Sequence, residues 1–439
     1  MSGIDVKAFE DRLRRRNAVL GVIGLGYVGL PLTLAACAAG FRVLGFDIDV
    51  PRVADLNRGI SPLKQIDNSR VSAVVADRRF QATTDFGRLD EPDAILICVP
   101  TPLGKHREPD LSYIEDTARS VAAGLRPGQL VILESTTFPG TTREIVKIIL
   151  EVSSLRSGVD FYLAYSPERE DPGNIDFETS RIPKVVAGDG NDALMLAQAL
   201  YEQIVVRTVP VSSLDTAEAV KLTENIFRAV NIALVNELKI VFDAMGIDVF
   251  EVIEAAKTKP FGYMPFYPGP GLGGHCVPID PFYLTWKARE HGVSTRFIEL
   301  AGEVNAYMPH YVVERTAQEL DRSSRKGMNG SRLLVVGLAY KKNVDDTRES
   351  PALTIIELLE TRGAEVAYHD PHVPVIPPTR EHGRLAGRRS VPLEPATVAS
   401  FDAVLIVTDH DAIDWQGLAA HAKLIVDTRN RLRKTAQHP

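Results

Sequence analysis

The chain has 439 residues, enough for two or three domains that each bury a core of their own. It is 45% hydrophobic and 24% charged, and its formal net charge of −7 argues against general binding of nucleic acid. No apolar run reaches about 18 residues, so we expect no membrane span. Three scattered cysteines argue against a disulfide framework or a structural zinc site, so we expect no metal and a cytoplasmic location.

The first part of the chain alternates predicted strands and helices. An apolar strand at 19–23 runs directly into the sequence GLGYVG, a small-residue helix follows at 31–39, and a second strand at 41–46 ends in Asp47. Further strands are predicted at 94–99, 130–133 and 161–164, with helical stretches between them. This alternation is typical of a doubly wound α/β sheet.

The middle of the chain changes character. Residues 214–245 contain neither proline nor glycine and predict one helix about 45 Å long, at 1.5 Å per residue. A helix of that length needs more cover than one small domain provides, so we expect it to join two lobes and to bury a homodimer face.

A second strand-and-helix unit follows a basic joint at 322–332. Its predicted elements are strands at 333–337, 365–368, 403–407 and 424–426 and a helix at 350–361. The predicted fold class is therefore α/β, with two Rossmann-like doubly wound domains at 1–210 and 326–439 and a central helical dimerisation domain at 211–325.

The GLGYVG segment is a GxGxxG motif between a strand and a helix, with Asp47 18 positions after its last glycine. In this context the glycines admit a pyrophosphate and the carboxylate accepts bonds from a ribose. The acid would repel a 2′-phosphate and so favours NAD over NADP, whereas the nearby Arg52 points the other way. The predicted cofactor contacts here are Gly24, Gly26, Tyr27, Val28, Gly29, Asp47 and Arg52.

Polar side chains follow several predicted strands at their carboxyl ends, where open α/β sheets bind ligands. Thr101 and Thr136 offer hydroxyls to a cofactor or substrate, or they cap turns and helices. In SPERE (166–170), Glu168 is a candidate general base and Arg169 a candidate anion clamp. A charged surface loop is the alternative interpretation.

The long helix carries a polar row. Lys221, Asn225 and Arg228 share one helix face, and asparagine is a poor residue in the middle of a helix. The spacing indicates a polar notch in an otherwise apolar surface. A solvated stripe that includes Glu218 and Glu224 is the alternative.

Cys276 lies in the glycine-rich segment GPGLGGHCVPIDPF (269–282) beside His275. Free backbone N–H groups and a neighbouring histidine favour a nucleophilic thiolate. Asp280 is predicted to be the N-cap of the helix that follows, with Pro281 in its first position. Its carboxylate is also a candidate for holding or activating water.

Seven motifs occur in one order along nearly the whole chain: GLGYVG, VPTP, ESTTFPGTT, SPERE, KLTEN, GPGLGGHCVPIDP and AYKKNVDDTRESPA. Together they closely resemble the UDP-glucose/GDP-mannose dehydrogenase family. The resemblance implies two Rossmann-like domains around a helical dimerisation domain. It also implies NAD as cofactor, a UDP-sugar as substrate, and oxidation of the primary alcohol at C6 to a carboxylate with two NAD per turnover and no metal.

The resemblance further implies roles for single residues. Cys276 would be the nucleophile, Lys221 and Asn225 would stabilise oxyanions, and Asp280, Glu168 and Thr136 would handle water. The implied substrate contacts are Arg169, Glu170, Lys221, Asn225, Arg228, Gly273, Tyr340 and Lys341. The implied cofactor contacts beyond the glycine loop are Thr101, Thr136 and Arg348, the last reaching across subunits.

The segment around Cys276 departs from the usual pattern of the UDP-glucose enzymes. Those enzymes read GGSCxxKD, whereas this chain reads GGHCVPID. The variant resembles the branch that acts on UDP-N-acetylhexosamines, with UDP-GlcNAc ahead of UDP-ManNAc, and UDP-glucose remains a further alternative.

Other classes of function leave motifs unexplained. A cysteine hydrolase built on Cys276 and His275 leaves GLGYVG unused. A non-catalytic nucleotide-sensing module gives Cys276, Lys221 and Asn225 no purpose. Hydroxy-acid dehydrogenases with a long helix need no cysteine.

Overall fold

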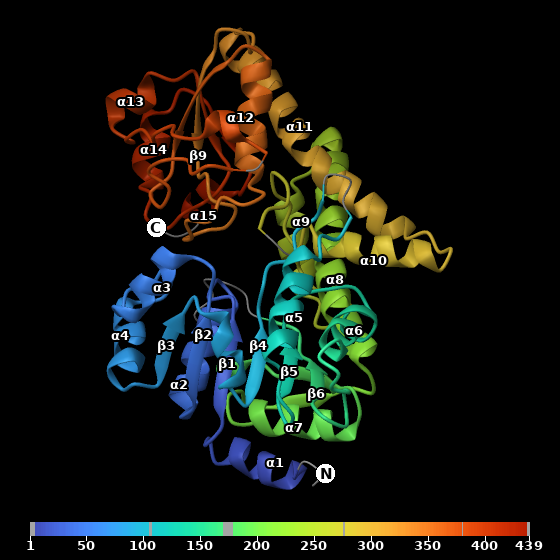
Figure 1. Ribbon diagram of the computed structural model, residues 1–439. Coiled ribbons are helices and arrows are strands. Elements are labelled where there is room, and N and C mark those ends of the chain that lie inside the picture. Colours follow the sequence, from blue (N-terminus) through green and yellow to red (C-terminus); the bar gives the residue numbers. More distant parts are fainter. Residues whose placement is uncertain (1–4, 105–107, 170–178, 275–276, 380, 437–439) are drawn as a thin grey trace. The chain divides into compact units, whose positions relative to one another are not determined.

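A computed structural model of the chain describes residues 5–104, 108–169, 179–274, 277–379 and 381–436 (Figure 1). The chain forms two compact units, one made of residues 1–224 and 282–293 and the other of residues 225–281 and 294–439. Each unit has a sheet and a core of its own. The predicted three-domain bounds, 1–210, 211–325 and 326–439, stay a prediction.

The first unit is built on an eight-stranded sheet in the order β3-β2-β1-β4-β5-β6-β7-β8. Its strands are β1 (Val19–Ile23), β2 (Arg42–Phe46), β3 (Phe80–Thr83), β4 (Ala94–Ile97), β5 (Leu130–Leu133), β6 (Tyr162–Tyr165), β7 (Lys184–Gly188) and β8 (Thr208–Pro210). All neighbouring pairs are parallel except β6 and β7. Because the strand order reverses on the two sides of β1, a ligand crevice is expected at the carboxyl ends of β1 and β4.

Both faces of this sheet are buried, which explains why its strands are continuous apolar runs. Alternate residues of one strand belong to different cores: Leu20 and Val22 pack on one face and Ile23 on the other. Helices α2 and α7 contribute to the first core, and α5 contributes to the second.

The helices of this unit include α1 (Val6–Arg14), α2 (Gly29–Ala39), α3 (Val50–Asn57), α4 (Asn68–Ala76), α5 (Ser112–Gly124), α6 (Lys147–Glu151) and α7 (Asn191–Tyr201). Shorter segments are the 3-10 turns η1 (Phe86–Asp90) and η3 (Thr179–Arg181) and the π-helical η2 (Thr142–Val146). The predicted strands at 19–23 and 130–133 have the observed bounds, and the other predicted strands of this sheet differ at their ends by one or two residues.

The long helix α8 spans Leu214–Met245, as predicted. It is followed by α9 (Val249–Lys257), α10 (Asp280–Glu290) and α11 (Arg296–Ser324). Helix α11 has 29 residues and contains Pro309 in its interior.

In the second unit, the four parallel strands have the order β10-β9-β11-β12. They are β9 (Arg332–Val336), β10 (Glu365–His369), β11 (Ala403–Ile406) and β12 (Ile425–Asp427), and the helices are α12 (Pro351–Thr361), α13 (Pro395–Ala399), α14 (Trp415–His421) and α15 (Arg431–Ala436), with a 3-10 turn η4 (Gly383–Leu385). Figure 1 shows α11 beside α12, and the two helices share a core through Val313 and Ile356.

The predicted α/β class, with two doubly wound Rossmann-like sheets and one long helix, is confirmed. In the described ranges, no helix combines the length and the apolar character that crossing a membrane requires.

Candidate active site

The glycine loop after β1 has one glycine that the protein itself does not require. A Cβ atom on Gly24 would lie 2.6 Å from the Cys98 carbonyl oxygen, and one on Gly29 would lie 1.8 Å from the Gly24 carbonyl oxygen. A Cβ on Gly26 would meet no heavy atom of the described chain within 4 Å. The open space beside Gly26 therefore fits the close approach of a pyrophosphate, while Gly24 and Gly29 permit the turn and the packing of α2.

Asp47 follows β2 and lies against this loop. Its Oδ2 accepts hydrogen bonds from the Leu25 N–H at 2.9 Å and from Arg52 Nη1 at 3.0 Å. The carboxylate is 5% exposed, whereas the Arg52 side chain is 34% exposed. Asp47 and Arg52, which are expected to favour different cofactors, thus form an ion pair, and the acid is placed where a ribose would be held. Tyr27 and Val28 are half-buried between Gly26 and α2.

Residues 135–137, in the loop after β5, carry three hydroxyl side chains, and two of them are hydrogen-bonded within the protein. Ser135 donates to the Val99 carbonyl oxygen at 2.8 Å, and Thr137 donates to Glu218 at 3.3 Å, so turn chemistry accounts for both. Thr136 is half-buried, and its hydroxyl makes no hydrogen bond within the described part of the chain. Thr101, after β4, is buried, and its carbonyl oxygen accepts a bond from the Tyr283 hydroxyl.

Glu218 of α8 is fully buried and ties the long helix to that loop. Its carboxylate accepts bonds from the Gly140 N–H at 2.6 Å, the Thr142 N–H at 2.8 Å and the Thr142 hydroxyl at 2.6 Å. Burial raises the pKa of Glu218 to about 7 and outweighs these bonds, which lower it, while Asp215 adds to the increase. The sequence pattern predicts no role for Glu218 beyond membership of a solvated stripe.

The predicted polar row on α8 is not a solvated stripe. Glu218, Lys221 and Asn225 are 0%, 6% and 4% exposed, and only Arg228 at the end of the row is well exposed. Among the described residues, Lys221 has no hydrogen-bond or ion-pair partner. A lysine that is only 6% exposed and has no partner in the described part of the chain favours an anionic or polar ligand.

Asn225 and Asp280 form a buried pair. Asn225 Nδ2 donates to Asp280 Oδ2 at 2.5 Å, and Asp280 is 3% exposed. Helix α10 begins at Asp280, one residue before the predicted first helical position, Pro281. The carboxylate in the first helical turn is compatible with the helix dipole, and its side chain bonds to α8.

Glu168 and Arg169 do not form a solvated loop. Glu168 is 8% exposed, and its Oε1 accepts from the Arg169 N–H at 2.7 Å. The Arg169 guanidinium donates to Glu224 at 2.5 and 3.2 Å and to the Pro183 carbonyl oxygen at 2.6 Å. Glu170, the third predicted residue of this segment, lies outside the described residues.

A buried ionic network adjoins Glu168. Lys184, at the start of β7, donates to Glu134 Oε2 at 2.6 Å, and the Tyr201 hydroxyl donates to the other oxygen of Glu134. None of these three residues was predicted from the sequence. The available signal was a lysine heading the apolar run KVVAG and a glutamate directly after the buried strand β5.

In the second unit, the glycine-rich segment packs on the loop after β9. A Cβ on Gly273 would lie 2.6 Å from the Tyr340 Cβ, and the Gly274 N–H donates to the Arg348 carbonyl oxygen at 3.0 Å. The Arg348 guanidinium donates to Asp346 at 2.6 to 3.0 Å. The structure thus brings Gly273, Tyr340 and Arg348 together, with Lys341 half-buried after them, whereas His275 and Cys276 lie outside the described residues.

Arg429 is a cation beside the same segment that sequence analysis missed. It follows β12 in the sequence DTRN, and its Nε donates to the Val407 carbonyl oxygen at 2.7 Å. A Cβ on Gly269 would lie 2.8 Å from Arg429 Nη1. A cation at the carboxyl end of a parallel strand is suitably placed for an anionic ligand.

Three family models match successive parts of the chain. The NAD binding domain of the UDP-glucose/GDP-mannose dehydrogenase family matches residues 18–205, its central domain matches 215–307, and its UDP binding domain matches 334–434. The chain belongs to this family. It is accordingly an NAD-dependent nucleotide-sugar dehydrogenase, and the alternatives of a cysteine hydrolase and of a non-catalytic sensing module are wrong.

Similar dehydrogenases cover nearly the whole chain. It is 36% identical to the UDP-N-acetyl-D-mannosamine dehydrogenase of Pyrococcus horikoshii, over 94% of this chain and 96% of that one. It is 34% identical to the UDP-N-acetyl-D-glucosamine 6-dehydrogenase of Pseudomonas aeruginosa, over 93% and 94%. A solved structure of UDP-D-ManNAc dehydrogenase from Pyrococcus horikoshii matches with a TM-score of 0.84 at 35% identity, over 94% of this chain and 95% of that one.

The family assignment gives the glycine loop of the first unit its ligand. The cofactor is NAD, and the open space beside Gly26, the buried Asp47 and the parallel sheet fit it. No cluster of three or more His, Cys, Asp or Glu residues suited to a metal ion occurs in the part of the chain that the structure describes.

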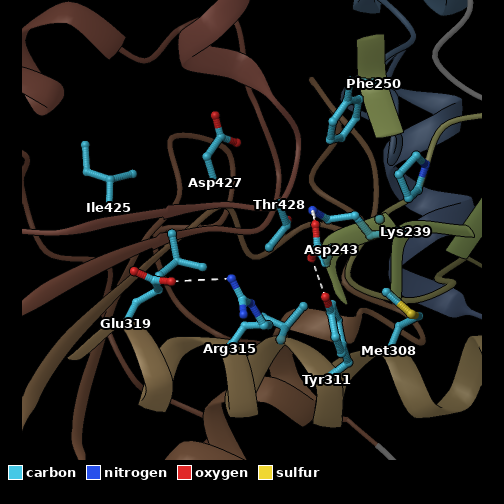
Figure 2. A pocket seen from close by; sticks show the side chains of 14 residues that line it. Lys239, Asp243, Phe250, Met308, Tyr311, Arg315, Glu319, Ile425, Asp427 and Thr428 are labelled. Carbon is cyan, nitrogen blue, oxygen red and sulfur yellow. Dashed lines mark hydrogen bonds and ion pairs between the residues drawn. The ribbon is translucent and has the colours of Figure 1, made fainter. Parts of the chain in front are cut away.

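Figure 2 shows a cavity of about 260 Å³ in the second unit of this dehydrogenase, and none of the predicted site residues lines it. It lies among α8, α11 and the end of β12, and Pro268 and Gly269 form part of its wall. Both of its cations are paired with carboxylates: Asp243 accepts from Lys239 and from the Tyr311 hydroxyl, and Arg315 pairs with Glu319 at 3.3 Å. Asp427 adds a further carboxylate to the wall. The cavity therefore offers an anionic ligand less than Lys221 or Arg429 does.

Proposed function

We propose that the chain oxidises the C6 hydroxymethyl group of a UDP-N-acetylhexosamine to a carboxylate, with UDP-GlcNAc as the preferred substrate. The observation that carries the reaction is the buried row on α8, in which Lys221 lies one turn before Asn225 and Asn225 is bonded to Asp280. The GGHCVPID variant and the relatives named for UDP-N-acetyl sugars support the choice of substrate. UDP-ManNAc is the second candidate because one such relative is named for it.

The reaction converts one alcohol, two NAD and one water into one carboxylate, two NADH and three protons. NAD, when bound, accepts the hydride that leaves C6 in each oxidation. The Cys276 thiolate adds to the aldehyde carbon, which prevents the aldehyde from escaping, and the resulting thiohemiacetal still carries the second hydride. Water then adds to the thioester, the C–S bond breaks, and the thiol is restored.

The side chains around this chemistry have separate tasks. Lys221 and Asn225 stabilise the negative oxygen that forms on C6, and loss of one such donor costs roughly 10²- to 10³-fold in rate. Glu168 removes a proton from the water that hydrolyses the thioester, and Asp280 and Thr136 help to hold this water.

The UDP part needs cations because the chain as a whole is acidic. Lys341 and Arg429 of the second unit are the candidates, each in the loop that follows a parallel strand. Arg169, also predicted as a substrate contact, has its guanidinium bonded to Glu224, so a direct contact would require it to exchange this partner.

We also infer that the chain forms a homodimer through the central helix. Large apolar side chains are exposed on α8 and on the segment after α9: Leu234 is 55% exposed, Met245 63%, Phe261 72% and Met264 63%. Phe297 near the start of α11 is 79% exposed. An apolar surface of this kind is typical of a protein interface, and a second copy of the chain offers the matching surface.

The test combines a substrate panel with a cysteine variant. Purified chain and NAD are mixed with UDP-glucose, UDP-GlcNAc, UDP-GalNAc or UDP-ManNAc, and NADH formed per sugar consumed is measured. We expect two NADH per sugar and the fastest turnover with UDP-GlcNAc. Cys276→Ala should bind NAD normally and form no acid, whereas Cys37→Ala in α2 should form acid at nearly the wild-type rate.

Faster oxidation of UDP-glucose than of every N-acetylated sugar would contradict the substrate. Normal acid formation by Cys276→Ala would contradict the covalent route. Light scattering tests the dimer: a monomeric wild-type chain would contradict it, and Leu234→Glu should weaken a dimer that exists.

A further inference from the structure

Lys184 forms a buried ionic network with two carboxylates. Its Nζ lies 2.6 Å from Glu134 Oε2 and 3.8 Å from Glu168 Oε2, and it donates to the Pro167 carbonyl oxygen at 3.3 Å. Lys184, Glu134 and Glu168 are 5%, 0% and 8% exposed. The network therefore connects the end of β5 and the start of β7 to the loop after β6.

Two further groups complete the surroundings. The Tyr201 hydroxyl donates to Glu134, and its ring centroid lies 5.1 Å from the Lys184 ammonium. The Cys98 thiol and the Arg169 backbone N–H also face the network. Burial lowers the pKa of Lys184, but the carboxylates of Glu134 and Glu168 outweigh burial, so its pKa is raised and the ammonium keeps its proton.

We propose that Lys184 is a positioning residue that holds the Glu168 carboxylate in its charged form, while Glu134 sets how much of the lysine's charge Glu168 feels. This inference rests on the proposed function, in which Glu168 removes a proton from water. A general base must be unprotonated at the working pH, and a neighbouring ammonium in a buried site favours that form.

A purely structural role explains the network less well. A buried ion pair commonly stabilises a fold no more than apolar residues of the same volume would. The geometry is also unequal: the ammonium is in hydrogen-bond contact with Glu134, yet it lies 3.8 Å from Glu168. At that distance it acts on Glu168 through its charge and does not occupy the oxygen as a direct hydrogen-bond donor.

The two partners of Lys184 make opposite predictions for the pH dependence. In Lys184→Met, Glu168 loses its neighbouring cation, so the acidic limb of kcat should move up by roughly one pH unit or more. Glu134 is fully buried and burial raises its pKa, so it should become neutral in this variant. In Glu134→Gln, the whole charge of Lys184 acts on Glu168, so the limb should move down. Lys184→Arg should restore a limb close to that of the wild type.

The experiment measures kcat against pH with whichever UDP-sugar the wild-type chain oxidises. Mass spectrometry of acid-quenched samples gives a second readout, because a protonated Glu168 leaves the covalent sugar adduct unhydrolysed. The adduct should accumulate up to a higher pH in Lys184→Met and only to a lower pH in Glu134→Gln. Lys147→Met is the matched control, since Lys147 forms an ion pair with Asp189 at 2.7 Å in the same unit, and its limb should not move.

The double variant Lys184→Met/Glu134→Gln covers the case in which Lys184→Met fails to fold, because it removes both charges together. Because Glu134 should be neutral once Lys184 is removed, the limb of the double variant should lie close to that of Lys184→Met and above that of the wild type. Shifts of both single variants in the same direction, or an unshifted limb in the folded double variant, would overturn the inference. Failure of the proposed function is distinct: the wild-type chain would then form no NADH from any UDP-sugar.

Discussion

Two glycines of one loop should respond to the same substitution in different ways. In Gly26→Ala the added methyl meets no heavy atom of the described chain within 4 Å, so the fold should be unaffected. In Gly29→Ala the methyl would lie 1.8 Å from the Gly24 carbonyl oxygen, far inside van der Waals contact. Gly29→Ala should therefore destabilise the first unit by about 1–3 kcal/mol or more, as overpacking does.

Gly26→Ala, which should leave the fold unaffected, should weaken the binding of NAD. The methyl of Gly26→Ala would occupy the open space that a pyrophosphate needs, and a lost hydrogen bond to a charged group costs about 1.5–3 kcal/mol. Since each 1.4 kcal/mol is a factor of ten, NAD affinity should fall roughly 10- to 150-fold. Gly26→Ala should thus be a stable protein that binds NAD poorly.

Calorimetric titration with NAD and thermal unfolding without NAD separate the two effects. Gly383→Ala is the matched control, because its methyl also meets open space, but in the other unit. The reasoning is refuted if Gly26→Ala binds NAD within about twofold of the wild type, or if Gly29→Ala unfolds at the wild-type temperature.

Two further predictions concern buried carboxylates. The pKa of Glu218 is raised from 4.5 to about 7 in the folded chain, so its stabilising contribution is complete below about pH 4.5 and is lost as the pH rises through about 7. Urea unfolding should show the free energy of unfolding of the wild type falling by up to about 3 kcal/mol across this window, relative to that of Glu218→Gln. Glu237→Gln, whose substituted residue is exposed on the same helix, should follow the wild type. A pH-independent difference between the wild type and Glu218→Gln would contradict this prediction. Asn225→Asp would place a second carboxylate against Asp280, whose Oδ2 lies 2.5 Å from the amide nitrogen of Asn225, so one of the two acids must stay protonated. The thermal midpoint of Asn225→Asp should therefore decrease, relative to that of Asn225→Ala, as the pH is raised from about 6 to about 8. Midpoints of the two variants that change in parallel would show that the two acids do not interact.

The parts of the fold that the sequence predicts are those with a strong local pattern. Helix α8 has the predicted bounds because neither proline nor glycine interrupts it, and β1 is recognisable because apolar residues run directly into GLGYVG. Helix α11 is harder to predict because Pro309 lies in its interior, and a proline normally ends a helical pattern. Strand β7 begins with a charged lysine and ends in a glycine, so only Val185, Val186 and Ala187 give it an apolar pattern.

In the site, too, short motifs could be predicted from the sequence, whereas contacts between residues far apart in the chain could not. The glycine loop and Asp47 are predictable because a short motif contains the whole chemical requirement. The network of Glu134, Lys184 and Tyr201 is not, because its members are 50 and 67 residues apart from Glu134 and meet only once the strand order is known. A lysine in an apolar run signals a buried partner, but the sequence does not say which carboxylate provides it.

The two Rossmann-like sheets place an acid at the same point and use it differently. Asp370 follows β10 as Asp47 follows β2, and each accepts a backbone N–H from the neighbouring loop, Leu338 at 2.6 Å for Asp370. Asp370 is also bonded to His410 Nε2 at 3.0 Å and to backbone N–H groups at 372 and 373. Burial acts to raise its pKa, but these bonds lower it to about 2.

The partners decide what each acid can bind. Arg52, the side-chain partner of Asp47, is 34% exposed and can turn outward, which leaves the carboxylate to a ribose. His410 is 0% exposed and is held on its other side, where Nδ1 accepts the Asn343 N–H at 3.0 Å. Asp370 and His410 together therefore fix the loop that carries Tyr340 and Lys341, and no oxygen of Asp370 is left for a dinucleotide. The repeated fold thus divides the ligands: the first sheet keeps its acid for NAD, and the second uses its acid to build the loop proposed to hold UDP.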